Sequence, residues 1–152
     1  MLLHGNTLIE DNYQIRIWDS LSIDQRAKRW EETFSKPKKD THVFVAEIDR
    51  EIVGFCSVGP CRDNDMDKHT SELWAIYVDP KSMNKGIGSA LHEHGLNYLR
   101  GSCYKKAILW VLTSNEKTRK WYGGRGWVVE GKTKIDQRED FQLHETRYVI
   151  NL

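Results

Sequence analysis

The sequence predicts an α/β domain whose mixed sheet holds a central pair of parallel strands. Residues 73–78 (LWAIYV) and 107–112 (AILWVL) are apolar at every position, as strands buried on both faces are. Between them, residues 87–100 repeat apolar side chains at helical spacing, and Gly101 follows as a stop. Strand, helix and strand within about 40 residues make one parallel βαβ unit with a right-handed crossover.

The first 21 residues fit two structures. Tyr13, Ile15 and Ile17 alternate with polar residues, which fits a strand over 13–18 or an irregular segment. A helix is expected to begin at Ser22, which forms a capping box with Gln25 ahead of an apolar face.

The later segments predict a hairpin, a second helix and two closing strands. Residues 42–48 and 52–58 are rich in β-branched and aromatic residues and are joined by the short segment 49–51. The helix over 87–100 is expected to bury Ile87, Ala90, Leu91, His94 and Tyr98. The closing elements are a helix over 115–122 that ends at Gly123-Gly124, and strands over 127–133 and 146–150.

Composition and charge exclude several classes of function. The chain has 152 residues, and 23 Lys and Arg against 22 Asp and Glu give a net charge of +1. This balance supplies no general attraction to nucleic acid or to an anionic membrane. The longest apolar runs are six residues, whereas a membrane span needs about 20. We therefore expect one domain over 1–152, with no nucleic-acid or membrane partner.

The start of the chain and the cysteines predict a cytoplasmic protein. Residues 1–6 (MLLHGN) lack the basic and long apolar regions of a signal peptide. Cys56, Cys61 and Cys103 form no C-x-x-C pair, and an odd, sparse count is typical of a reducing compartment.

The sequence predicts no metal site. Asp63, Asp65 and Asp67 begin like a calcium loop, but Lys68 stands where that loop needs Gly and Trp74 where it needs Glu. His92 and His94 are two residues apart on a helix, so they point to nearly opposite sides.

The turn over 79–89 is the strongest candidate for a ligand site. In open α/β sheets, ligands bind beyond the carboxyl ends of the strands, at the turn into the next helix. Gly86 and Gly88 remove side chains there, the N–H groups at a helix start are unpaired, and Lys85 adds positive charge. These features favour a phosphate or pyrophosphate. Leu91 replaces the third glycine of a dinucleotide-binding fingerprint, and the segment lacks a P-loop pattern.

Residues 72–127 resemble the GNAT superfamily of N-acetyltransferases. The family's acyl-CoA loop, Arg/Gln-x-x-Gly-x-Gly/Ala, corresponds to 83–88 (MNKGIG), with Met83 in place of Arg or Gln. The family's later signature corresponds to Asn115, then Tyr122, then Gly126 and Trp127. The backbone amides remain despite Met83, so we expect binding to survive that difference.

The resemblance implies that acetyl-CoA is the acyl donor and that Tyr122 protonates the departing thiolate. Glu72 is the candidate general base for deprotonating an amine. The N–H groups of the strand over 76–78 are candidates for stabilising the thioester oxyanion. The residues expected to bind the cofactor are Ile76, Tyr77, Val78, Met83, Asn84, Lys85, Gly86, Ile87, Gly88, Ser89, Asn115 and Arg119.

Each assignment has a purely structural alternative. Gly86 and Gly88 fit a tight turn, Asn115 fits a helix N-cap, and Tyr122 fits a core aromatic. Glu72 fits a solvated carboxylate at a strand end. Three tryptophans would wall an acceptor pocket or pack in the core: Trp18, Trp30 and Trp74.

The resemblance therefore predicts a GNAT-like N-acetyltransferase acting on a primary amine of a small molecule or peptide. The alternatives are an acyl-CoA-binding module without turnover and an O-acyltransferase, and a homodimer is left open. The family opens with a strand and two helices. About 20 residues separate Ser22 from the first well-defined strand, and one helix uses most of them. We therefore expect residues 1–21 not to form the family's opening strand and helix.

Overall fold

The computed structural model describes residues 8–10, 13–17, 40–137 and 139–152, and these form one mixed sheet covered by helices. The sheet order of the described strands is β1-β2-β3-β4-β5-β6-β8-β7. No helix in this part of the chain is long and apolar enough to cross a membrane. The strands are β1 (Leu8–Glu10), β2 (Tyr13–Ile17), β3 (His42–Ile48), β4 (Glu51–Pro60), β5 (Thr70–Val78), β6 (Lys106–Leu112), β7 (Val128–Gln137) and β8 (Gln142–Asn151). The helices are the short 3-10 helix η1 (Pro80–Ser82), α2 (Ile87–Gly101) and α3 (Glu116–Gly123).

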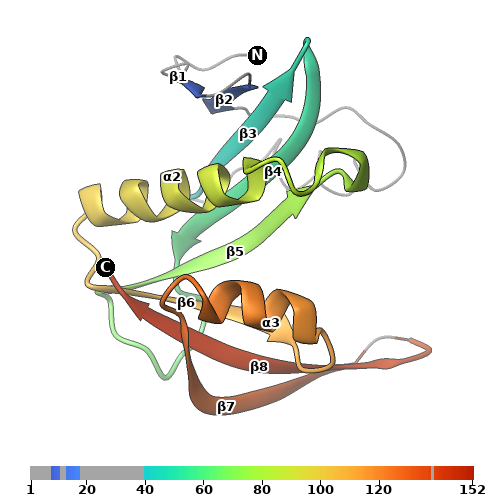
Figure 1. Ribbon diagram of the computed structural model, residues 1–152. Helices are drawn as coiled ribbons and strands as arrows, with labels where there is room; N and C mark the ends of the chain where they lie inside the picture. The colour runs from blue at the N-terminus through green and yellow to red at the C-terminus, as the bar shows by residue number, and fades with distance from the viewer. Residues whose placement is uncertain (1–7, 11–12, 18–39, 138) are drawn as a thin grey trace.

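The predicted parallel pair is confirmed, and it is short. β5 and β6 pair in parallel through Thr70↔Lys106, Ser71↔Ala107 and Glu72↔Ile108. Among the described residues, no further pair joins these strands, so they separate toward their carboxyl ends (Figure 1). Every other neighbouring pair in the described sheet is antiparallel. This is the separation expected of a site between the two strands.

Helix α2 packs across β3, β4 and β5, and α3 lies on the same side of the sheet over β6 and β8 (Figure 1). Gly95 allows the close approach of α2, because an added Cβ would lie 2.9 Å from the Cys56 sulfur and 3.1 Å from Val58. The predicted buried face was wrong in detail. His94 and Tyr98 stay partly exposed, and His92 and Gly95 are buried with the leucines at 91, 96 and 99.

The end of α2 also differs from the prediction. Gly101 is the last helical residue and has no positive φ, whereas Cys103 takes the left-handed conformation, at φ 66°. The left-handed residue that turns the chain from α2 toward β6 is therefore Cys103, two residues after the predicted helix stop at Gly101.

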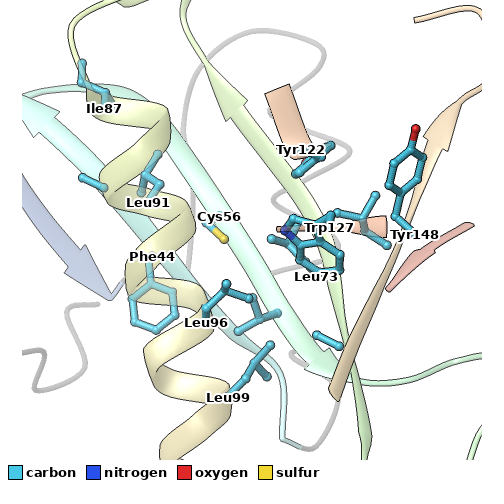
Figure 2. Close-up of a cluster of buried hydrophobic side chains, with 14 of the residues drawn as sticks. Phe44, Cys56, Leu73, Ile87, Leu91, Leu96, Leu99, Tyr122, Trp127 and Tyr148 are labelled. Atoms are coloured by element: carbon cyan, nitrogen blue, oxygen red, sulfur yellow. The ribbon is translucent and has the colours of Figure 1, made fainter. Parts of the chain in front are cut away.

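One core lies between the helices and the sheet. Leu91, Leu96 and Leu99 line the side of α2 that faces Cys56 and Trp127 (Figure 2). A smaller cluster lies on the opposite face of the sheet, with Ala75 and Ile52 packed against it. Its buried members are Val43, Val45 and Phe55.

The predicted hairpin of β3 and β4 is confirmed. Asp49 and Arg50 make its turn with φ of 49° and 67°, the conformation of a two-residue turn that matches the twist of paired strands.

The expectation that the opening strand is missing was wrong. β2 pairs antiparallel with β3 through Ile15↔Ala46, Arg16↔Val45 and Ile17↔Phe44, and β1 pairs with β2. The length argument failed because it counted only residues after Ser22, whereas β2 lies before Ser22 and needs only about five residues. The helix predicted from Ser22 lies outside the described residues, as do Trp18 and Trp30.

Candidate active site

A cavity of about 220 Å³ opens where β5 and β6 separate. A β-bulge precedes it: Leu73 lies opposite Val58 and Ala75 opposite Ser57, which leaves Trp74 as the extra residue. A bulge bends its strand, and this bend leads β5 away from β6. The cavity is lined by Leu73, Trp74, Ala75, Ile76, Leu109, Trp110, Val111, Leu112, Thr118, Tyr122 and Glu145.

Both faces of the sheet contribute to this cavity. Leu109 and Val111 belong to the main core together with Tyr122. Trp110, between them on β6, instead contacts Lys134 and Arg147 on the other face. The gap between the strands therefore connects the helix-covered face with the opposite face.

Tyr122 lies at the end of α3 and lines the cavity, as the sequence motif predicted. Its ring is 5% exposed and packs edge-on against Trp121 and Trp127. Burial raises the pKa of its phenol, so the hydroxyl carries its proton at neutral pH. Among the described residues, no hydrogen bond is recorded for this hydroxyl. The cavity wall thus presents a proton donor.

The start of α2 has a backbone geometry that suits an anion. Gly86 is its N-cap at φ 81° and makes no side-chain cap. The first backbone bond of the helix is Ala90 N–H to the Gly86 carbonyl, so the N–H groups of residues 87–89 have no partner within the helix. An added Cβ at Gly88 would lie 3.6 Å from both Trp121 and Val78, which is ordinary contact.

Most predicted side chains around this start face solvent. Lys85 is exposed, Met83 is 43% exposed, and Asn84 takes a left-handed φ of 62°. Ile87 is buried in the core, so only its backbone faces the site.

Arg125 adds a cation that sequence reasoning missed. Its Nη2 donates to the Ser89 hydroxyl at 2.5 Å, and its guanidinium lies 3.7 Å over the Trp121 ring. Partial burial lowers the pKa of Arg125. A signal was present in the sequence, because Arg125 lies between Gly124 and Gly126 of the later motif.

Glu72, the candidate general base, does not lie at a solvated strand end, which was its structural alternative. Glu72 lies inside β5 and is 2% exposed. Arg62 donates to its carboxylate from the backbone N–H, Nε and Nη2, so both oxygens are engaged. That alternative failed because β5 begins three residues earlier than the apolar run.

Asn115, Arg119 and Tyr77 make scaffold contacts. The Asn115 side chain caps α3 by accepting from Thr118 N–H at 3.1 Å. Arg119 donates to the Tyr148 hydroxyl and to the Thr113 carbonyl, at 3.0 and 2.9 Å. Tyr77 is 45% exposed. Of the predicted cofactor residues, Ile76 lines the cavity.

Val78 and Tyr77 occupy opposite faces of β5 near the cavity. Val78 packs against the main core beside the position of Gly88. Tyr77 stacks on Phe55 on the opposite face, at 5.9 Å between ring centroids.

The acidic loop before β5 binds an arginine. Arg147 on β8 is 3% exposed and donates to Asp63 and Asp65, and it also pairs with Glu130 on β7. Trp110 Nε1 donates to Asp63 as well. These contacts raise the pKa of Arg147 and lower that of Asp65. The loop thus anchors the C-terminal hairpin.

Comparisons with known proteins agree with this geometry. The model of the acetyltransferase (GNAT) family matches residues 9–127. An uncharacterized N-acetyltransferase of Archaeoglobus fulgidus is 36% identical over 87 residues, which cover 55% of this chain and 57% of that protein. A mycothiol acetyltransferase of Acidimicrobium ferrooxidans is 34% identical over 89 residues, which cover 57% of this chain and 28% of that protein. The chain therefore spans well under two thirds of the length of either relative.

Solved structures share the fold. A putative GNAT acetyltransferase from Desulfovibrio desulfuricans superposes with a TM-score of 0.70 at 16% identity, covering 91% of this chain and 98% of that one. A GNAT family acetyltransferase from Elizabethkingia anophelis with acetyl-CoA bound gives a TM-score of 0.68 at 17% identity, covering 94% and 100%. Because the family model spans most of the sequence and the fold is shared, the chain belongs to the GNAT acetyltransferase family.

Proposed function

We propose that this protein transfers an acetyl group from acetyl-CoA to a primary amine. The observation that carries the proposal is the gap between β5 and β6, with Tyr122 in its wall. The family relatives named as N-acetyltransferases support the same activity.

The residues at the start of α2 fit the phosphates of acetyl-CoA. The N–H groups of 87–89 and the helix dipole favour an anion there. Lys85 and Arg125 supply positive charge, and Gly88 leaves room for close approach. The Elizabethkingia structure, which shares the fold, has acetyl-CoA bound. We extend the binding site to Met83, Asn84 and the other predicted loop residues.

The edge of β5 that faces the gap fits the pantetheine arm. The ladder between β5 and β6 ends at Glu72, so backbone groups over 76–78 are directed into the gap. An amide-containing chain can pair with them as an added strand does. A backbone N–H of this segment would also stabilise the oxyanion of the thioester. Asn115 and Arg119 lie at the outlet of β6 and would border the arm.

Acetyl-CoA supplies an acyl thioester. The protein orients the two reactants and supplies the proton that the leaving thiolate needs. The acceptor arrives as an ammonium ion and releases one proton, after which its nitrogen attacks the thioester carbon. The C–S bond breaks, the nitrogen loses a second proton, and the Tyr122 hydroxyl protonates the thiolate. Solvent restores the Tyr122 proton, so the products are an amide, free CoA and one proton.

The cysteines of the described chain are unpaired, as is usual for proteins of a reducing compartment. Cys56, Cys61 and Cys103 are free thiols in the structure, and burial raises the pKa of Cys56 to about 12. The unpaired thiols support the cytoplasmic location that we propose.

Binding of CoA tests the donor site directly. CoA at 100 times its Kd should stabilise the folded protein by about 2.7 kcal/mol. Gly88→Glu should abolish the shift, because its carboxylate occupies and repels the phosphate position. Gly101→Glu, at the opposite end of α2 with open space around it, is the matched control and should keep the shift. An equal CoA shift in both variants contradicts the donor site.

Thiol release separates transfer from mere binding. Wild-type protein should release CoA thiol from acetyl-CoA faster when a primary amine is added. A CoA shift without amine-dependent thiol release would identify an acyl-CoA-binding module. Release driven by alcohols in place of amines would identify an O-acyltransferase.

A further inference from the structure

The ammonium group of the protein's own Lys134 lies against the cavity wall formed by Trp110 and Glu145. The Nζ of Lys134 lies 4.1 Å from the ring centroid of Trp110 and 3.6 Å from the Glu145 carboxylate. Three strands contribute these residues, because Lys134 pairs with Glu145 between β7 and β8, and Glu145 pairs with Leu112 on β6. An aromatic face and a carboxylate thus hold one primary ammonium group between them.

Two of the three residues face the candidate site. Trp110 and Glu145 line the cavity that Tyr122 also lines. Lys134 approaches from the surface: its side chain is 41% exposed, whereas that of Glu145 is 20% exposed. A flexible, exposed lysine can leave a contact of this kind at small cost. The wall can therefore accept another ammonium ion in place of Lys134.

Among the described carboxylates near Trp110, Glu145 is the one available to bind an ammonium ion, because the others pair with Arg147. Arg147 faces the same tryptophan, with its guanidinium carbon 5.6 Å from the ring centroid. Its charge is matched by Asp63, Asp65 and Glu130. Those carboxylates are engaged with Arg147, whereas Glu145 forms its ion pair with Lys134.

We propose that Trp110 and Glu145 form the subsite for the acceptor's ammonium group, and that Lys134 occupies this subsite in the free protein. The proposal rests on the acetyltransferase function proposed above and names its acceptor class. The group that fits is an unbranched primary alkylammonium of the lysine type, because a lysine side chain occupies the place. Cation–π attraction and the carboxylate both favour the charged form.

The subsite also supplies the first proton acceptor of the reaction. The bound ammonium passes one proton to Glu145, directly or through water, and Glu145 passes it to solvent. The neutral nitrogen then attacks the thioester carbon, and it loses its second proton to solvent. Tyr122 protonates the thiolate as the C–S bond breaks, and solvent restores the Tyr122 proton. Lys134 competes with the acceptor for Glu145, so it sets the acceptor's KM.

Steady-state kinetics with pentylamine and Nα-acetyl-lysine amide test the subsite. Glu145→Gln should raise the KM of both amines about 10-fold to 100-fold, as loss of a charge-assisted hydrogen bond does. Lys134→Met should lower these KM values about threefold to fivefold, since an exposed ion pair no longer competes. Lys132→Met removes the same charge two residues away on β7 and should leave them unchanged. The KM of acetyl-CoA should be unchanged in all three variants.

The choice of amine checks the acceptor class. Pentylamine should exceed 3-aminopentane in kcat/KM, and equal values would contradict the preference for an unbranched amine. A higher kcat/KM for pentylamine would indicate a free amine as the acceptor, and a higher kcat/KM for the lysine amide would indicate a lysine in a peptide. Either result supports the subsite.

Calorimetry separates this proposal from the proposed function. Pentylammonium titrated into CoA-loaded protein should bind more tightly to Lys134→Met and more weakly to Glu145→Gln. Unchanged affinity in both variants would overturn the subsite while the CoA shift and turnover still support the transferase. If CoA does not stabilise the protein and no turnover is seen, the transferase function is rejected. The same titration without CoA would then still decide whether Trp110 and Glu145 bind an ammonium ion.

Discussion

Tyr122 carries the most specific chemical role that the sequence predicts. Tyr122→Phe keeps the buried ring and its edge contacts with Trp121 and Trp127 and removes only the hydroxyl. Loss of a general acid should lower kcat about 10²-fold to 10⁴-fold. The Kd of acetyl-CoA should change little, because the proton is donated in the transition state. Rapid-quench turnover and CoA binding measure the two quantities.

The melting temperature of Tyr122→Phe is the control that separates loss of catalysis from loss of folding. Among the described residues no hydrogen bond is recorded for the hydroxyl, so the melting temperature should stay close to that of the wild type. A variant with full kcat would show that Tyr122 only packs and that water protonates the thiolate.

His92 makes the folded state sensitive to acid. It is 4% exposed, and its Nε2 accepts from the Trp127 indole N–H at 2.9 Å. Burial first, and the charge of Arg125 second, lower its pKa from 6.5 to about 4. Between these values the unfolded chain binds a proton that the folded protein does not. Stability from this residue is therefore complete above pH 6.5 and is lost as the pH falls toward 4.

His92→Gln removes this acid sensitivity and keeps an acceptor for the Trp127 N–H. The wild type should lose about 3 kcal/mol of unfolding free energy relative to the variant between pH 7 and pH 4. Urea denaturation of both proteins at each pH measures the difference. Parallel pH curves for the two proteins would mean that His92 is protonated in the fold.

At the scale of elements, α2 approaches the sheet closely because position 95 has no side chain. An alanine normally stabilises a helix interior by about 1 kcal/mol over glycine. At Gly95 the added Cβ would lie 2.9 Å from the buried Cys56 sulfur, which must move. Gly95→Ala should therefore destabilise the fold by about 1–3 kcal/mol, the cost of overpacking. Chemical denaturation measures this cost.

Two further variants identify the cause. Gly101→Ala, in the last position of the same helix with nothing within 4 Å of its Cβ, should not destabilise. Adding Cys56→Ala to Gly95→Ala should recover part of the loss. A stabilising Gly95→Ala would show that α2 moves off β4 without cost.

The sequence predicted the elements whose pattern is local. The uniformly apolar segments of β5 and β6 and the spacing of α2 identified the parallel unit. The sequence left β2 undecided between a strand and an irregular segment, because its stability comes from pairing with β3, about 30 residues away. The loop that we propose binds acyl-CoA was identified because glycines mark it.

Contacts made by side chains distant in sequence escaped prediction. Arg62 engages Glu72, and Arg125 reaches Ser89 over 36 positions. The cavity wall formed by Trp110 and Glu145 depends on the order of three strands, which no local pattern specifies. Motif reading thus pointed to the residues that we propose bind the acetyl donor, and it gave no indication of the cavity wall opposite them.

At the scale of the whole molecule, Arg147 joins distant parts of the chain. It connects β8 with the loop at Asp63 and Asp65 and with Glu130 on β7. Arg147→Met would leave Asp63 and Glu130 without this cation, whereas Asp65 would keep its ion pair with Lys132. The free energy of unfolding should fall by about 1–3 kcal/mol, because Arg147 is buried but its carboxylate partners are partly exposed. Urea denaturation measures it.

Arg100→Met is the matched control, since Arg100 pairs with Glu93 on the surface. That variant should lose less than about 1 kcal/mol. Equal losses in the two variants would mean that the Arg147 network adds nothing beyond an exposed pair.

The three-pair seam between β5 and β6 has a consequence for amide hydrogen exchange. In a strand, successive N–H groups point to opposite neighbours, so every second amide over 75–78 faces the gap while the others pair with β4. Deuterium uptake along this segment should therefore alternate, fast then slow, residue by residue. Saturating CoA should slow the fast set alone, and NMR exchange spectra would then trace the path of the pantetheine arm one amide at a time.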